Sequence, residues 1–189
     1  MIIEIYNVII EIEYSKKVKN MKFYRVKQFI WGVEAYFKKI DNSYLESYLN
    51  KNEINMFNKL KKSDKYHCIR VCNDSLKLLK DNNFNIDEHK LGKAALLHDI
   101  GKSKYHLNLI EKSTIVLLDK FSKGKLRKYD NIKQVDIYYN HPKIGYEMLK
   151  EYNYDKELLD VVRYHHMINR KEFKNNKIID IINICDNKN

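Results

Sequence analysis

The chain has 189 residues, which is most simply the length of one domain with a sizeable buried core. It holds one proline and five glycines, so few residues interrupt regular structure and an all-α fold is expected. No stretch approaches the roughly 18 apolar residues of a membrane span. The formal net charge of +11 attracts phosphorylated metabolites, nucleic acid or anionic lipid.

Most of this charge is explained by lysines spread over many predicted helix surfaces. The densest basic group consists of Lys120, Lys123, Lys125, Arg127 and Lys128. The three cysteines form no CxxC pair, and Cys68 and Cys72 are four residues apart on a predicted helix. This spacing suits a reduced core face, and the N-terminus lacks the pattern of a signal peptide. We therefore expect a cytoplasmic protein.

Residues 1–14 are rich in β-branched side chains and fit either a strand or a short amphipathic helix. Residues 1–20 differ in composition from the rest of the chain, so we expect an N-terminal extension outside the main fold. A helical pattern begins at Met21, and residues 21–52 are predicted to form helices that pack on the core. Asp41 and Asn50 are candidate N-caps within this region. Residues 53–189 would form the main domain.

In the main domain, Ser63 and Asp64 precede a predicted helix that carries His67 and a one-sided apolar stripe. Asp87 is expected to cap the next helix, whose apolar residues lead to the pair His98-Asp99. Gly101 is expected to end that helix.

A second apolar run covers residues 107–119, and residues 122–131 are predicted to form a polar, basic, mobile loop. The pair His141-Pro142 suggests a helix start at His141, because proline is favoured in the first turn. A helix opened by Asp155 points His165 inward, and a last helix over 177–186 ends at Asp186.

The run Leu97-His98-Asp99-Ile100-Gly101-Lys102 places an imidazole and a carboxylate side by side at a helix end. Such a pair can bind one metal ion, and Lys102 offers a cation for an anionic substrate. His67, His141, His165 and Asp186 are the candidate partners. Each has an ordinary explanation alone, as a boundary, capping or core residue, but an inward carboxylate at Asp186 needs a metal or a base.

The ordered series His67, His98-Asp99, His141, His165, Asp186, each on a predicted helix, resembles the HD-domain metal-dependent phosphohydrolases. Residues 98–102 resemble the HDIG subgroup, and the likeness covers about residues 53 to 189. The ending Cys185-Asp186-Asn187-Lys188-Asn189 is similar to that of small uncharacterised HD proteins of Gram-positive bacteria. The resemblance implies an all-α, HD-domain helical bundle with a metal site between core helices.

By the same resemblance, His67, His98, Asp99 and Asp186 hold a first metal, and His141 and His165 complete a second. Asp99 bridges the two and is catalytic together with Lys102, which contacts substrate phosphate. Two divalent ions are expected, iron or manganese first, with magnesium, cobalt, nickel or zinc as alternatives.

His166 is an additional candidate ligand, because the HD-GYP branch uses such a His-His pair for a third metal. The glutamate of that branch is replaced by Ser63, however, and its Gly-Tyr-Pro sequence is absent.

The implied activity is hydrolysis of a phosphoester or phosphoanhydride in a nucleotide-like substrate by metal-activated water, as a phosphomonoesterase or phosphodiesterase. One alternative is a regulatory HD protein that binds a nucleotide without turnover. The complete set of candidate ligands argues against this alternative. Another is an RNA-binding or RNA-cleaving protein, favoured by the charge but lacking a recognisable RNA-binding segment.

Overall fold

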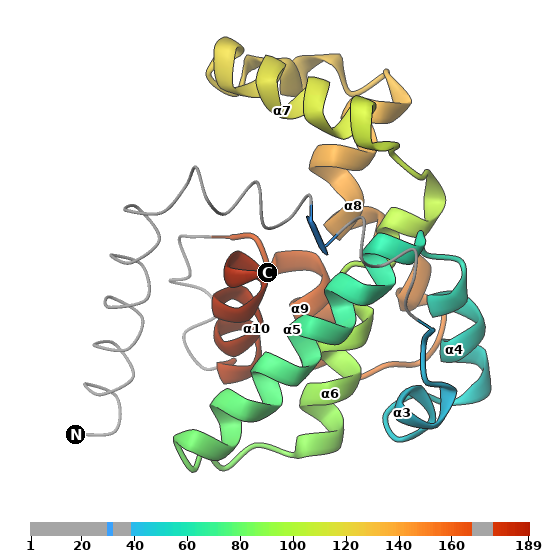
Figure 1. Ribbon diagram of the computed structural model, residues 1–189, viewed down its shortest axis with the longest axis vertical. Helices are drawn as coiled ribbons and strands as arrows, with labels where there is room; N and C mark the ends of the chain where they lie inside the picture. Colours follow the sequence, from blue (N-terminus) through green and yellow to red (C-terminus); the bar gives the residue numbers. More distant parts are fainter. Residues whose placement is uncertain (1–29, 32–38, 168–175) are drawn as a thin grey trace.

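The computed structural model describes residues 30–31, 39–167 and 176–189, which are helical with no β-strand (Figure 1). The expected all-α fold is therefore confirmed, whereas residues 1–20 and most of the helical pattern from Met21 lie outside the described residues. No helix in the described parts combines the length and hydropathy of a bilayer span. The elements are α3 (Asn42–Glu46), α4 (Lys51–Asn58), α5 (Lys62–Asp81), α6 (Glu88–Leu97), η1 (Ile100–Lys104), α7 (Leu109–Ser122), η2 (Lys125–Tyr129), α8 (Lys133–Lys150), α9 (Lys156–Tyr164) and α10 (Lys177–Lys188), where η marks a 3-10 helix.

Short polar side chains start most of these helices, as the sequence predicts. Asp41, Asp87 and Asp155 each accept a hydrogen bond from a backbone N–H in the first turn of their helix. Asn50 forms a reciprocal capping box with Glu53 at the start of α4. The expectation that Ser63 precedes the next helix is wrong, because α5 begins at Lys62 without a side-chain cap.

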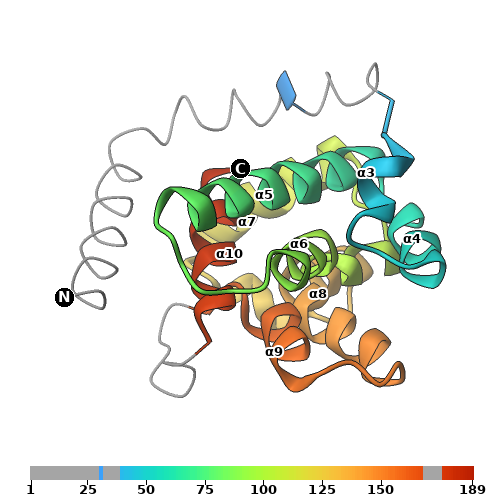
Figure 2. The same cartoon turned by 90° about the horizontal axis from the view of Figure 1, so that it is seen from below.

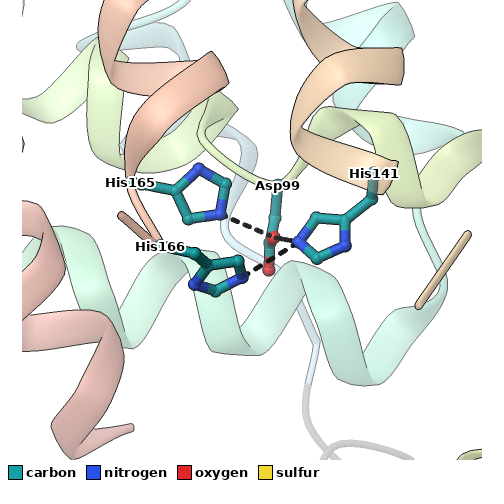
Figure 3. Close-up of side chains that lie close together, drawn as sticks. All are labelled: Asp99, His141, His165 and His166. Carbon is teal, nitrogen blue, oxygen red and sulfur yellow. Dashed lines mark hydrogen bonds and ion pairs between the residues drawn. The ribbon is translucent and has the colours of Figure 1, made fainter. Parts of the chain in front are cut away.

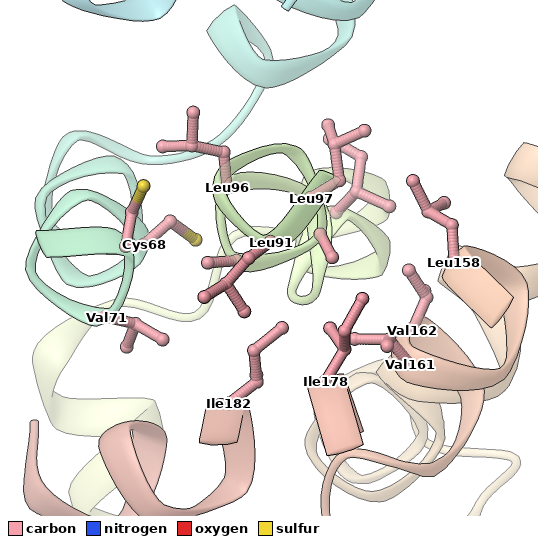
Figure 4. Close-up of a cluster of buried hydrophobic side chains, with 14 of the residues drawn as sticks. Cys68, Val71, Leu91, Leu96, Leu97, Leu158, Val161, Val162, Ile178 and Ile182 are labelled. Atoms are coloured by element: carbon pink, nitrogen blue, oxygen red, sulfur yellow. The ribbon is translucent and has the colours of Figure 1, made fainter. Parts of the chain in front are cut away.

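The hydrophobic core lies between α5, α6, α9 and α10 (Figure 4). Helix α6 is central, and its residues from Ala94 to Leu97 are fully buried, which explains why they form a continuous apolar run rather than a stripe. All three cysteines are buried, and Cys68 and Cys72 lie on the core face of α5, as their spacing predicts. This packing holds the C-terminal ends of α6 and α9 in place. The residues that follow these two ends are polar: His98 and Asp99 after α6, and His165 and His166 after α9.

Two glycines allow η1 to approach α8 closely. A Cβ atom on Gly101 would lie 2.0 Å from the carbonyl oxygen of His141 and 2.6 Å from the backbone nitrogen of Gly145. A Cβ atom on Gly145 would lie 3.0 Å from the nitrogen of Gly101. The expectation that Gly101 ends the preceding helix is wrong: α6 ends at Leu97, and Gly101 lies inside η1. Its role is to let two backbones touch.

Helix α7 and η2 lie at one end of the molecule, beside the beginning of α8 (Figure 1). In the view from below, α7 is therefore seen behind the other helices (Figure 2). Two hydrogen bonds join α7 to α8: Asp119 accepts one from the Tyr139 hydroxyl, and Glu111 accepts one from Gln134. Ile115 is buried at this contact. The segment 122–131, predicted as a loop, contains the 3-10 helix η2.

Candidate metal centre

Five elements bring the predicted ligand residues together at one place. His67 comes from α5, His98 and Asp99 from the end of α6, His141 from α8, His165 and His166 from the end of α9, and Asp186 from α10. Their ligating atoms form three overlapping groups, each within 4.8 Å: Asp99, His141, His165 and His166; His67, His98 and Asp99; and His98, His165 and Asp186. Residues far apart in the sequence thus share one polar cluster.

Asp99 lies in the middle of this cluster, and its two oxygens face different histidines. Oδ2 is 3.5 Å from Nε2 of both His67 and His98. Oδ1 is 3.2 Å from Nε2 of His141 and 3.6 Å from Nε2 of His165 (Figure 3). One carboxylate is therefore shared between two pairs of imidazoles, an arrangement suited to bridging two cations.

Asp186 supplies a second carboxylate on the side of His67. Its Oδ1 lies 2.9 Å from Nε2 of His67 and 3.8 Å from Nε2 of His98, while its Oδ2 lies 3.3 Å from Nδ1 of His166. Asp186 is 10% exposed and Asp99 is fully buried. Two nearly buried carboxylates in one cluster require positive charge nearby.

Three of the histidines are oriented by carbonyl groups of their own helices. Nδ1 of His98 is 2.7 Å from the Ala95 oxygen, and Nδ1 of His165 is 2.9 Å from the Val162 oxygen. Nδ1 of His141 is 3.0 Å from the Ile137 oxygen. A carbonyl only accepts, so each Nδ1 must donate, and in the neutral form of each ring Nε2 carries a lone pair that points at the cluster.

The prediction that His141 starts a helix is wrong, because α8 begins at Lys133 and Pro142 lies inside it. Proline has no N–H to donate to the carbonyl four residues earlier, which is that of Tyr138. Nδ1 of His141 lies 3.2 Å from this oxygen. The position inside α8 buries His141 to 4% exposure, which a helix start on the surface would not have done.

The charge states of the cluster suit a divalent cation. Burial would raise the pKa of Asp99, but the charges of Lys102 and His98 outweigh it and hold this pKa well below its ordinary value. Burial and the neighbouring Lys102 lower the pKa of His141 to about 4, and burial and His166 lower that of His165 to about 3. At neutral pH the cluster therefore offers an anionic carboxylate and neutral imidazoles at His141 and His165, which are the forms that bind metal. Burial would lower the pKa of His98, but the Asp99 carboxylate outweighs burial and raises this pKa, so a metal ion would have to displace the proton of this ring.

Lys102 in η1 supplies the nearest cation. Its Nζ lies 2.5 Å from Oδ2 of Asp99, and its side chain is 24% exposed. Burial disfavours the charged ammonium, but the Asp99 carboxylate outweighs this effect and raises the pKa of Lys102. This charged lysine beside the Asp99 carboxylate is partly open to solvent and can meet an anion.

Several buried polar atoms of the cluster have no hydrogen-bond partner in the described part of the chain, as expected of atoms that bind a metal ion. The buried atoms Nε2 of His98, Nε2 of His165 and Oδ1 of Asp99 have no hydrogen-bond partner within the described residues. Buried polar atoms without a partner are costly and rare. Nitrogen and carboxylate donors of this kind are the ligands that transition-metal ions prefer, so bound ions would satisfy these atoms.

His166 and Asn183 complete the surroundings of the cluster. His166 is half exposed, and its Nε2 lies 3.1 Å from Nε2 of His141. Asn183 on α10 donates a hydrogen bond to the carbonyl of His165 and accepts one from Asn187. The sequence motifs did not single out Asn183, although its spacing of three residues from Asp186 puts both on one side of α10. Asn183 therefore ties the end of α9 to the helix that carries Asp186.

Comparison with known families gives one match: the family model of the HD domain matches residues 65–188. This range contains all the residues of the cluster. No curated protein and no solved structure matches the chain.

Proposed function

Because the chain belongs to the HD-domain family of metal-dependent phosphohydrolases, we propose that it hydrolyses a phosphate bond of a nucleotide-like substrate. The bond would be a phosphoester or a phosphoanhydride. Support comes from the buried cluster of histidines and carboxylates, which includes the donor types that such chemistry requires.

We propose a binuclear centre in which Asp99 is shared. His67, His98 and Asp186 would hold one ion with Oδ2 of Asp99, and His141 and His165 would hold the other with Oδ1. His166 is an additional candidate ligand on the exposed side. The single observation that carries the proposal is the division of the Asp99 oxygens between two pairs of histidines.

When bound, divalent ions supply Lewis acidity and lower the pKa of water toward neutrality. The protein's own residues would do the remaining work. Lys102 would attract a substrate phosphate by its charge, and its ion pair with Asp99 keeps it close to the reacting bond. The buried side of the centre, formed by α6 and α9, would exclude solvent from behind the phosphate.

The test is the metal content of the full, untagged chain, purified anaerobically and measured by elemental analysis. Close to two ions per chain supports the binuclear centre, and hydrolysis is then measured on phosphate monoesters, phosphodiesters and dinucleoside polyphosphates. One ion per chain would overturn the binuclear arrangement. No ion after reconstitution with iron or manganese would overturn metal-dependent hydrolysis.

A Lys102→Gln variant sharpens this test, because it removes the cation but none of the proposed ligands. We expect unchanged metal content and a fall in kcat/KM of about 100-fold, the size typical of losing one preorganised group beside a reacting phosphate. Lys104→Gln in the same 3-10 helix is the matched control, since this lysine is exposed. Equal activity of the two variants would contradict the role of Lys102.

A further inference from the structure

Helix α7 exposes large apolar side chains on the face that points away from α8. Phe121 is 81% exposed and Ile110 is 78% exposed, and Leu117 and Leu118 are about half exposed. Ile110, Leu117 and Phe121 follow one another at spacings of seven and four residues, so they lie on one helix face. Monomeric proteins seldom leave such a row open to water without a use for it.

The end of this apolar row carries the densest basic group of the chain. Lys120, Lys123, Lys125, Arg127 and Lys128 are all at least partly exposed, and residues 120–128 contain no acid. Lys123 and Gly124 adopt left-handed backbone conformations, with φ of 51° and 82°, and turn the chain from α7 into η2. The turn brings η2 beside the end of α7. The Arg127 guanidinium lies 5.4 Å from the centre of the Tyr139 ring of α8, so the cations of the outward surface are Lys120, Lys123, Lys125 and Lys128.

The carboxylates of α7 face the other way. Glu111 is bonded to Gln134 and to the backbone of Asn108, and Asp119 is bonded to Tyr139 of α8. Asp119 is two residues before Phe121, which places it nearly opposite on the helix. Asp130, just beyond the basic run, is the acid that comes nearest in sequence on that side. The outward surface is therefore apolar along α7 and positive at its end.

We propose that this surface, formed by α7 and η2, binds the face of an anionic lipid bilayer. The apolar row would enter the boundary between headgroups and acyl chains, and the basic group would meet lipid phosphates. Such binding goes beyond the proposed function, because none of these residues belongs to the metal centre. It is also compatible with the absence of a membrane-spanning helix among the described residues.

Two features favour a bilayer over other occupants. A single-stranded nucleic acid would fit the charge but is bound by stacking on aromatic side chains, whereas this row is mainly aliphatic. A second copy of the chain would cover the apolar row but would offer the basic group no matching anionic surface, because residues 120–128 contain no acid. An anionic bilayer matches both the apolar and the charged part.

The experiment is co-sedimentation of the full chain with vesicles of phosphatidylcholine alone or mixed with phosphatidylglycerol. Binding is expected only to the vesicles that contain phosphatidylglycerol. A variant with Lys123→Gln, Lys125→Gln and Lys128→Gln should bind about 100-fold more weakly, since each cation contributes about a factor of five near an anionic surface. Phe121→Ser combined with Leu117→Ser should weaken binding at least about tenfold.

Lys150→Gln combined with Tyr152→Ser is the matched control, because it removes a cation and an exposed ring at the opposite end of α8. It should leave vesicle binding unchanged. The proposal is overturned if the α7 and η2 variants bind vesicles as well as the control does. It is also overturned if the chain binds RNA but not these vesicles, or if Phe121→Ser converts a dimer to a monomer without affecting vesicle binding. Circular dichroism checks that each variant is folded.

Discussion

Polar side chains are usually exposed and apolar side chains buried. The candidate metal centre and the outer face of α7 are opposite exceptions to this rule. His98, Asp99 and His165 are polar and fully buried, whereas Phe121 and Ile110 are apolar and largely exposed. Both placements leave atoms without the surroundings they prefer. By our two proposals, each region is completed by something outside the polypeptide: metal ions at the centre and a bilayer at α7.

The two regions also differ in how they are attached to the fold. The centre lies at the junction of α5, α6, α8, α9 and α10, so a disturbance there reaches the core. Helix α7 contacts α8 through hydrogen bonds and the buried side chain of Ile115, and none of its described residues belongs to the main core. Substitutions should therefore be costly at the centre and mild on α7.

The largest effect is expected from Asp99→Ala. Losing the shared carboxylate removes a ligand from both proposed ion sites, so metal affinity should fall more than about 100-fold and turnover should be abolished. Elemental analysis and hydrolysis of a phosphodiester measure the two effects.

Asp81→Ala is the matched control for this change, because Asp81 is an exposed carboxylate at the end of α5. It should retain metal and activity. Turnover by Asp99→Ala at the level of this control would remove the basis for a bridging role.

The next largest effect is a difference in the free energy of unfolding between alanine variants of two glycines. Gly101 lies beside the candidate metal centre, and Gly124 lies between α7 and η2. Gly101→Ala forces a Cβ atom into the backbone of α8 and should lower the free energy of unfolding by about 3 kcal/mol. Gly124→Ala meets no atom within 4 Å, but it places a side chain at φ of 82° and should cost about 1 kcal/mol.

Urea unfolding of the metal-free proteins measures both glycine variants. Gly101→Ala should also bind metal more weakly, because the clash involves the carbonyl of His141. If both variants lose only about 1 kcal/mol of the free energy of unfolding, η1 can move away from α8 at little energetic cost, which would contradict the prediction for Gly101.

The smallest effect is expected for Phe121→Ser, which should change the free energy of unfolding by less than about 0.5 kcal/mol. Leu96→Ala in α6 should cost about 3 kcal/mol, because Leu96 is fully buried. The midpoints of urea unfolding compare the two. A Phe121 variant as unstable as the Leu96 variant would mean that the apolar row packs within the chain.

Local patterns in the sequence predicted much of this structure. The caps at Asp41, Asn50, Asp87 and Asp155 depend on hydrogen bonds within one turn, so nearby residues suffice to identify them. The continuous apolar run of α6 likewise marked a buried helix that ends at the metal centre. The order of histidines and acids indicated the candidate ligands but not their distances.

The missed features depend on contacts between elements. Pro142 favours a helix start when considered alone, yet α8 begins earlier and carries His141 into the interior. Gly101 resembles a helix terminator, but its closest neighbours belong to α8. The apolar run of α7 predicts a helix with an apolar face and says nothing about what covers that face. Tertiary packing decides each of these cases.

The tie between Asn183 and the carbonyl of His165 has a consequence for synthesis on the ribosome. Among the elements that carry candidate ligands, α5 emerges first and α10 last. Helix α10 brings both Asp186 and the side chain that holds the end of α9. A nascent chain that lacks α10 would therefore lack Asp186 and the side chain that holds the end of α9, so the cluster is complete only when this helix has been translated.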